Sequence, residues 1–382
     1  GGKQIESVDS IKRYAPKIYS AYNRAVTAAD YEALIPKIYP ETESVSVFGG
    51  EELTPPKYGK VFITIKPFYG PYVPDSIKNN LNSMLRKYSV AGIVTEIQDL
   101  KYLYVEVDVN AYYNPSLTSS ANAVKTVVLN NITSYADSSV MNKYGAKFKY
   151  SKFQGVVDNS NDSITSNITK VVIRRDLKPA LNQNAEYELC FGNPFYIKNE
   201  NGFNIKSSGF SVFGQSNTVF LSDSPNADMK TGSLFLFTLT SKGNPTIVSN
   251  NVGSIDYQRA EILIKPINII GTSKKVQNIP IIEISACPKS NDIIGLQDLY
   301  LQLDISKSTV DMVADSITSG DSSSGTSYTA TSSYVNGDIA RLTESEKENT
   351  TLLSSDTYVL GATNLELLGA SNPTPTNTTS SY

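Results

Sequence analysis

The sequence predicts an α+β protein, in which a split βαβ-type antiparallel-sheet domain is followed by an all-β domain and a Ser/Thr-rich C-terminal tail. Between residues 59 and 178, strand-like and helix-like apolar spacings follow one another in the order β-α-β-β-α-β. Between residues 179 and 305 helical spacing almost vanishes, and short apolar runs are separated by Gly, Asn, Pro and Asp. Residues 306–382 have the Ser/Thr-rich composition typical of a flexible linker.

Residues 1–58 form an N-terminal segment for which we predict a helix and a strand. Thr27 precedes Asp30 by three positions, the pattern of an N-cap with an acidic partner. Pro36 should limit this helix to about two turns, and residues 44–47 alternate as a short strand. Apolar side chains at helical spacing give the helix one buried face: Tyr31, Leu34, Ile35 and Ile38.

Periodicity places the elements of the second segment, residues 59–178. In chain order it predicts strand 60–67, helix 74–89, strands 92–99 and 102–113, helix 119–137, and extended segments 148–158 and 168–176. This order is that of an antiparallel sheet with helices on one face.

The stretch AYNRAVTAADYEALI (residues 21–35), followed by SVSVFGGEEL and KVFITIKP, resembles the baseplate J-like family of contractile-tail proteins. More closely, it resembles the baseplate wedge proteins of T-even-type phages. The resemblance covers about residues 7–178, and the run GSIDYQRAEILI (residues 253–264) is similar to the C-terminal part of such proteins. The chain begins Gly1-Gly2 without an initiator Met, so we expect it to be the C-terminal part of a longer protein.

The resemblance implies a structural component of a phage tail baseplate. Such proteins form the inner ring by dimerisation, contact other wedge proteins, and take part in the baseplate rearrangement before sheath contraction. The implied location is the virion, with assembly in the host cytoplasm. The family carries no catalytic residues to transfer, and Arg24 is expected to contact a backbone group or a carboxylate near the packed Tyr31.

Composition argues independently against an enzyme. The chain has no histidine, which excludes Ser-His-Asp and Cys-His catalysis and removes the commonest metal ligand. Cys190 and Cys287 are too few for a thiolate metal cage and are predicted to be buried free thiols. The net charge of −3 argues against nucleic acid, and no apolar run approaches the ~18 residues of a membrane span. We therefore expect no catalytic residue, cofactor, metal or small-molecule substrate.

Two other kinds of tail protein stay open as alternatives. A cell-wall hydrolase would need two carboxylates, and Glu106 and Asp108 lie on one face of a predicted strand, about 6.6 Å apart. Val105, Val107 and Val109 occupy the other face, so the two acids are more simply its solvated side. A host-receptor-binding protein would suit the 24 tyrosines, but the sequence shows no repeat.

Self-association is expected in the all-β segment, residues 179–305. The runs SLFLFTLT (233–240) and AEILIKPINII (260–270) are apolar on both faces, and such strands must be covered. A symmetric partner would cover them, which makes a homodimer; the alternative is that they are the inside of a sandwich. The candidate interface residues are Leu234, Leu236, Tyr257, Leu263 and Ile282.

Overall fold

The computed structural model describes residues 24–315 except 54, 71, 119, 139–140, 198–202, 241–242, 277 and 297, together with residues 11, 12, 15, 16 and 19 and the short strands β20 and β21. The chain divides into two compact units. Unit 1 comprises Gly1–Tyr102, Ser139–Lys147 and Ile294–Gln302; unit 2 comprises Leu103–Ser138, Phe148–Ile293 and Leu303–Tyr382. Each unit combines distant parts of the chain. The contiguous division expected from the sequence (1–58, 59–178, 179–305, 306–382) stays a prediction.

Unit 1 contains a three-stranded sheet with two helices. β1 (Thr42–Gly49) pairs antiparallel with β2 (Lys60–Pro67), and β2 pairs parallel with β3 (Val94–Gln98). The parallel pair is joined through α3 (Asp75–Leu85), as a crossover requires. Side chains of α2 (Ala28–Ile38), α3, β1 and β2 share one apolar core. The unit also holds the 3₁₀ turn η1 (Gly50–Glu52) and the antiparallel pair of β5 (Lys143–Tyr144) and β18 (Leu299–Leu303).

The first helix begins where the sequence predicts but runs longer. α2 continues through Pro36 to Ile38, so the two-turn limit was wrong. Proline removes only its own N–H from the ladder, and near the end of a helix little of the ladder remains to be disturbed. The helix closes with the Tyr39 N–H donating to the Ile35 carbonyl at 2.7 Å.

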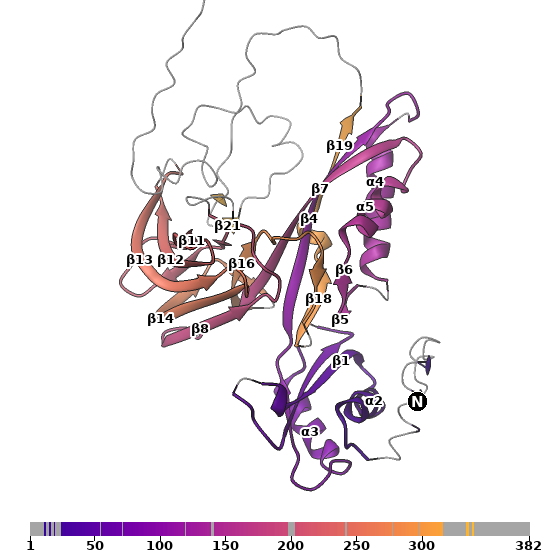
Figure 1. The fold of residues 1–382 in the computed structure, drawn as a ribbon, viewed down its shortest axis with the longest axis vertical. Coiled ribbons are helices and arrows are strands. Elements are labelled where there is room, and N and C mark those ends of the chain that lie inside the picture. Colours follow the sequence, from indigo (N-terminus) through magenta and orange to yellow (C-terminus); the bar gives the residue numbers. More distant parts are fainter. Residues whose placement is uncertain are drawn as a thin grey trace, which may run out of the picture. The chain divides into compact units, whose positions relative to one another are not determined.

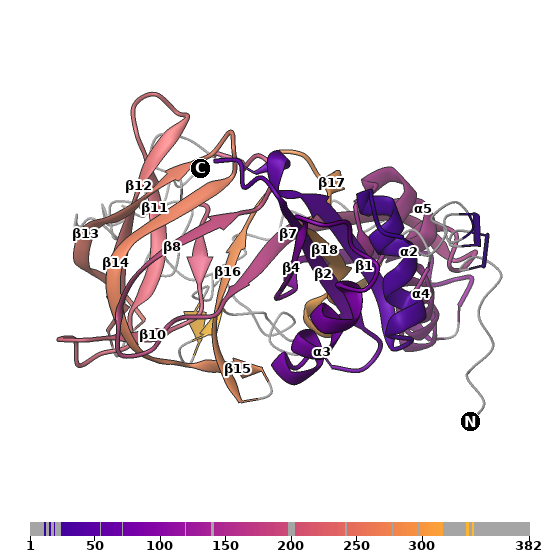
Figure 2. The same cartoon turned by 90° about the horizontal axis from the view of Figure 1, so that it is seen from below.

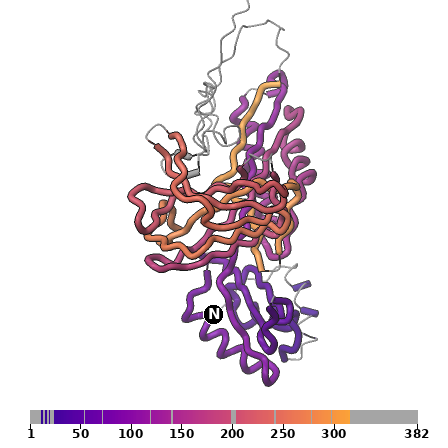
Figure 3. The backbone as a smooth tube through the Cα atoms, turned by 60° about the vertical axis from the view of Figure 1, so that its left-hand side comes forward, coloured from indigo at the N-terminus to yellow at the C-terminus, as the bar shows by residue number. Residues whose placement is uncertain are grey.

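The sheet of unit 2 is built on two long strands. β4 (Lys101–Tyr113) pairs antiparallel with β7 (Ile164–Leu177), and β16 (Ile279–Ala286) pairs with the end of β7. Figure 1 shows α4 (Ala121–Ala136) and α5 (Tyr150–Asp158) on one side of β4 and β7. β19 (Thr309–Ala314) returns to lie parallel to β4, and Figure 3 shows this last orange part of the tube beside a purple part.

The α+β class agrees with this mainly β structure, but the expected single split βαβ sheet is wrong. β2 and β3 belong to the three-stranded sheet, whereas β4 and β7 belong to another. Residues 148–158, expected to be extended, form α5 after the two-residue strand β6 (Lys147–Phe148). Phe153 and Val157 are four residues apart and buried, and the Tyr150 N–H at the helix start donates to Asp292 Oδ1 at 2.9 Å. This distant cap is invisible to local periodicity.

The described part of residues 179–305 consists of strands and loops, with a 3₁₀ turn beginning at Ile305, and contains no α-helix. Its main sheet has the order β10-β14-β13-β12-β11, with β8 also paired to β14; Figure 2 shows these strands side by side. Their bounds are β8 (Asn184–Cys190), β10 (Phe210–Val212), β11 (Phe220–Pro225), β12 (Thr231–Leu239), β13 (Pro245–Asp256) and β14 (Glu261–Thr272).

Shorter elements complete the described structure. β9 (Lys206–Ser207) and β15 (Lys274–Val276) each pair with β16, and β17 (Ile293–Ile294) pairs with β6. The turn η2 (Ile305–Lys307) precedes β19, so the expected tail at 306–382 begins with ordered structure. β20 (Tyr334–Val335) and β21 (Asp338–Ile339) form an antiparallel pair, and the other residues of the expected tail after Asp315 lie outside the described residues.

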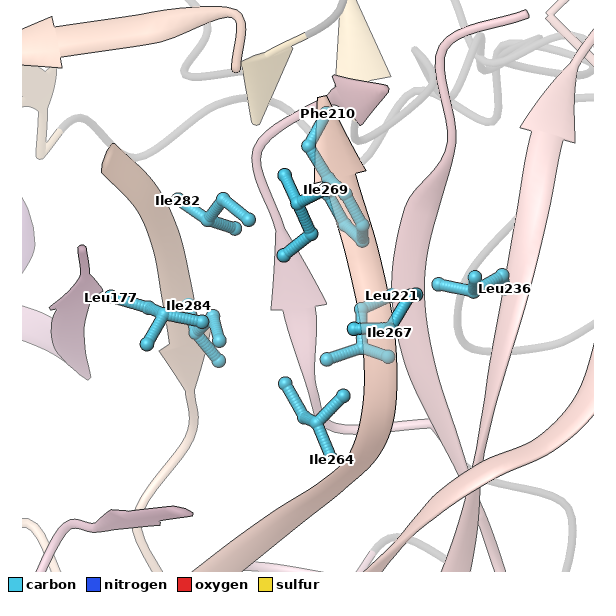
Figure 4. Close-up of a pocket in the computed structure, with 9 residues that line it drawn as sticks. All are labelled: Leu177, Phe210, Leu221, Leu236, Ile264, Ile267, Ile269, Ile282 and Ile284. Atoms are coloured by element: carbon cyan, nitrogen blue, oxygen red, sulfur yellow. The ribbon is translucent and has the colours of Figure 1, made fainter. Parts of the chain in front are cut away.

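The core of the β-rich part lies between β16 and the main sheet. Ile282 and Ile284 of β16 point towards Ile264 and Ile269 of β14 (Figure 4). The small cavity between them has a volume of about 10 Å³, roughly one water molecule, and only apolar side chains line it. A void of this size and polarity is a packing defect rather than a ligand site.

Candidate functional site

The most concentrated chemistry in the described residues is a buried charge cluster in unit 2 around Arg174 of β7. Its guanidinium bonds Glu106 of β4, Asp176 at 3.0 Å and Asp304 at 2.9 Å. The Arg174 side chain is 3% exposed, and its Cζ lies 4.3 Å from the centre of the Tyr104 ring. The β4–β7 register places Arg174 opposite Tyr104, which brings β4 and β7 side chains together.

A second cation extends the cluster to a neighbouring strand. Lys307 of η2 forms an ion pair with Glu283 of β16, which is buried. Arg175 points the other way and donates to the Cys190 carbonyl at 2.6 Å. The Asp304–Arg174 and Lys307–Glu283 ion pairs therefore connect the segment around residues 304–307 to β7 and β16.

The electrostatics of the cluster reflect its burial. Desolvation raises the pKa of Asp176 and outweighs the attraction of Arg174 and Lys307. Desolvation also opposes the charged form of Arg174, but Asp176, Glu106 and Asp304 together raise its pKa. Removing Arg174 would leave the carboxylates of Glu106, Asp176 and Asp304 without their shared counter-charge, which is strongly destabilising for buried ion pairs.

This geometry corrects the interpretation of Glu106 and Asp108. They are not the solvated side of a half-buried strand: Glu106 is 7% exposed and held by Arg174, and Asp108 accepts a hydrogen bond from the Thr309 hydroxyl. The guanidinium of Arg174 keeps its protons at neutral pH and so cannot act as a catalytic acid. A glycosidase also needs room for the sugar and a water molecule between its two catalytic carboxylates. The arrangement can bind strands together; it offers no acid–base pair.

Four of the five candidate interface residues lie inside the chain itself. Leu234 and Leu236 of β12, Ile282 of β16 and Tyr257 are all buried. Only Leu263 of β14 is exposed, at 39%. The alternative that the apolar runs fill a sandwich therefore describes the first four, because a partner could reach them only if unit 2 opened.

Tyr257 has an internal partner instead of an external one. Its hydroxyl donates to Asp223 Oδ2 at 2.5 Å, and the backbone N–H groups of Asn204 and Ile205 donate to Asp223 Oδ1 at 2.9 and 2.6 Å. Asp223 is completely buried, and desolvation raises its pKa to about 6 despite these three hydrogen bonds. The Asp223 carboxylate therefore links β11 to Tyr257, the residue that follows β13, and to residues 204 and 205.

The opening motif at residues 27–31 is a helix start, as predicted. Asp30 Oδ2 accepts the backbone N–H groups of Val26 at 3.0 Å and Thr27 at 2.8 Å, and the Asp30 N–H donates to Thr27 Oγ1 at 3.4 Å. Tyr31 is 1% exposed and donates to Ser89 Oγ at 3.0 Å. Arg24 is exposed, and no ion pair of it is found among the described residues.

The thiols and the acidic residues provide no metal site in the described part of the chain. There, no group of three or more Cys, Asp or Glu side chains is placed to hold a metal ion. Neither cysteine forms a disulfide, as predicted, but Cys190 is half-buried and Cys287 is exposed, which corrects the expected burial. Among the described helices, none is long and apolar enough to cross a membrane.

Sequence reasoning missed the Arg174 cluster. The available signal was the strand ITKVVIRRDL, in which Arg174 and Asp176 are two residues apart and so lie on the same face. The neighbouring strand β4 is rich in valine. Charges at such positions are buried only if a distant strand supplies partners. Here Glu106 and Asp304 do so from 68 and 130 residues away.

A strand-rich fold whose charged side chains form buried internal ion pairs is compatible with a structural protein. Comparison with known families gives this class a specific form. Residues 27–98 match the family described as baseplate structural protein gp6, C-terminal domain I, and residues 101–176 match its C-terminal domain III.

A curated relative carries the same name. The baseplate wedge protein gp6 of Enterobacteria phage T4 is 23% identical to this chain over 180 residues, which is 47% of the chain and 26% of the T4 protein. The chain thus spans about a quarter of the length of that relative. These similarities support a gp6-like structural component of a phage tail baseplate; the assignment to the J-like family stays a prediction.

Proposed function

We propose that this protein is a structural subunit of a baseplate wedge in a contractile-tailed phage. In this role it contributes to the inner ring by dimerisation, contacts other wedge proteins, and takes part in the rearrangement that precedes sheath contraction. Assembly takes place in the host cytoplasm before the virion is complete.

The observation that carries the proposal is the pair of adjacent matches. Two domains of one structural protein, C-terminal domains I and III of gp6, match residues 27–98 and 101–176 in order. The boundary between the matches lies close to Tyr102, where the first part of unit 1 ends. The first match therefore lies within unit 1, and most of the second lies within unit 2, apart from residues 101–102 and 139–147.

The buried ion pairs around Arg174 fit a subunit that has to bear force. Ion pairs that are shielded from solvent resist screening by salt, and the Arg174 cluster joins three stretches of chain that are far apart in the sequence. A ring subunit must transmit force without losing its fold, and such cross-links oppose sliding between strands.

The test is the position of this chain in the intact particle. A virion carrying a small peptide tag at residue 382 is imaged after labelling with a tag-specific Fab. We expect Fab density on the baseplate, at ring positions related by rotational symmetry. Density on a fibre or at the host-facing tip would support the receptor-binding alternative, and an unlabelled baseplate would contradict the proposal.

The hydrolase alternative is tested separately. Purified protein incubated with peptidoglycan should leave the turbidity unchanged and release no sugars, with lysozyme as the positive control. Steady turnover by this chain would contradict a purely structural role, whatever its position in the particle.

A further inference from the structure

β19 is attached to its sheet by its backbone ladder with β4 and by polar contacts at both ends. Residues 304–315, which we call the strap, contain η2 and β19. Along β19 only Val310 is buried; Thr309, Asp311 and Met312 are half-buried, and Val313 and Ala314 are exposed. Apolar burial is the main force that holds most strands in place; Val310 is the one buried side chain of β19, and α4 is the helix that lies against it.

Charged and polar groups hold the beginning of the strap. Arg174 contacts Asp304 at 2.9 Å, and Lys307 pairs with Glu283 of β16. The Asp304 N–H donates to the Val105 carbonyl at 2.9 Å, and the Val107 N–H donates to Ser308 Oγ at 3.1 Å. These contacts fix the register in which β19 meets β4.

The far end of the strap is held at two points. The Asp315 N–H donates to the Tyr113 carbonyl at 2.8 Å, and the Thr165 hydroxyl donates to Asp315 Oδ2 at 2.7 Å. Between the ends, β19 pairs with β4 in parallel from Thr309 to Ala314. A parallel ladder is slightly less stable per residue than an antiparallel one.

β4, the strand that pairs with the strap, has a second ladder on its other side. β4 and β7 pair antiparallel from Tyr104 to Tyr113, and α5 packs against β7. Val105, Val107, Val109 and Ile173 are buried to 2% exposure or less. The antiparallel ladder of β4 and β7 does not involve β19, so it can persist if β19 departs.

We propose that the strap is a releasable strand, locked onto β4 by the Asp304–Arg174 and Lys307–Glu283 ion pairs and able to detach while the β4–β7 pair stays folded. Detachment exposes the backbone edge of β4 over the length of β19, an edge able to accept a strand from another chain. This device goes beyond the proposed function, because it concerns opening within one chain and does not depend on where the chain sits.

The test is hydrogen exchange on the full chain, followed by mass spectrometry. Two variants each weaken one lock without leaving an unpaired buried charge: Asp304→Asn leaves Arg174 paired with Glu106 and Asp176, and the double variant Glu283→Gln/Lys307→Met removes both charges of the second pair. We expect protection of the amides of residues 309–314 to fall by about tenfold or more in each variant, with protection in β7 changed by less than about twofold.

A matched control separates the lock from loss of any ion pair. Lys149→Met removes the pair of Lys149 with Asp292, 2.8 Å apart and half-exposed, elsewhere in unit 2. It should leave the protection of residues 309–314 unchanged. The proposal is overturned if both lock variants leave the strap as protected as in the unaltered chain, or if β7 loses protection in parallel with the strap, since unit 2 would then open as a whole.

Discussion

Asp30 does more at the start of α2 than the hydroxyl of Thr27. The Asp30 carboxylate accepts two backbone N–H groups at 2.8 and 3.0 Å, whereas the Thr27 hydroxyl accepts one at 3.4 Å. Burial opposes the charged form, but these hydrogen bonds prevail and lower the pKa of Asp30. A lowered pKa in the folded state means stability that is present above the ordinary Asp range and is lost as the pH falls through the folded value.

Asp30→Ala should therefore be more destabilising than Thr27→Ala at pH 7. Loss of a cap generally costs about 1 kcal/mol, and we expect Thr27→Ala to fall below that value and Asp30→Ala to reach or exceed it. Urea unfolding at pH 7 and pH 3 measures both, and the Asp30→Ala effect should shrink at pH 3. Equal effects for the two variants at pH 7 would contradict this account.

Asp223 has the opposite pH signature. Its pKa is raised by burial to about 6, above that of an unfolded aspartate, so the native state binds the proton more tightly between roughly pH 4 and pH 6. Stability therefore falls as the pH rises through that window, by on the order of 3 kcal/mol for a shift of about two pH units.

Asp223→Asn should remove this slope. Asn keeps one oxygen for the Asn204 and Ile205 N–H groups and turns an amide towards Tyr257, with no charge to bury. We expect the free energy of unfolding of the variant, relative to the unaltered chain, to increase from pH 4 to pH 6.5. Asp162→Asn, at an exposed position, controls for the change in net charge; a relative stability that stays constant with pH would refute the prediction.

At the scale of elements, the β13–β14 pair depends on one close approach. A Cβ added to Gly253 would lie 2.2 Å from the Leu263 carbonyl oxygen and 2.8 Å from Leu234 Cδ1. The carbonyl belongs to the opposing strand and cannot move without disturbing the ladder between Gly253 and Ile264.

Gly253→Ala should therefore destabilise unit 2 by about 1–3 kcal/mol, the range of overpacked sites. Gly271→Ala in β14 is the matched control, because its added Cβ would meet no atom within 4 Å. Thermal unfolding of both variants measures the difference. Comparable melting temperatures for the two would show that β13 and β14 can separate at this point without penalty.

At the scale of the whole molecule, the proposed self-association has to use the surface that the fold leaves open. Of the five residues expected at an interface, Leu263 alone is exposed, on β14 opposite Glu188 of β8. Leu263→Lys places a cation next to that glutamate, so the strand pair is preserved while the outer face becomes charged.

We expect the full chain to dimerise at micromolar concentration and Leu263→Lys to be monomeric with an unchanged unfolding midpoint. Ile168→Lys, at an exposed apolar position of β7, is the control and should remain dimeric. Light scattering gives the masses. A monomeric unaltered chain would contradict dimerisation itself, and a dimeric Leu263→Lys would place the contact elsewhere.

The sequence by itself determined the local features. The capping pattern at Thr27 and Asp30, the strands at 60–67 and 102–113, and the strand-only character of the described 179–305 region follow from side-chain chemistry over a few residues. Each depends on contacts between neighbours in the chain, which periodicity records. The resemblance of residues 21–35 and their continuation to baseplate wedge proteins likewise agreed with the gp6 matches.

Only the tertiary structure decided which faces are covered and which strands share a sheet. Glu106 appeared solvated because its partner Arg174 is 68 residues away, and α5 appeared extended because its cap, Asp292, is 142 residues from Tyr150. Leu263 and Leu234 look alike in sequence, yet one is exposed and the other is fully buried. Burial and ion pairing are set by residues brought together from distant parts of the chain, so no window of local sequence contains them.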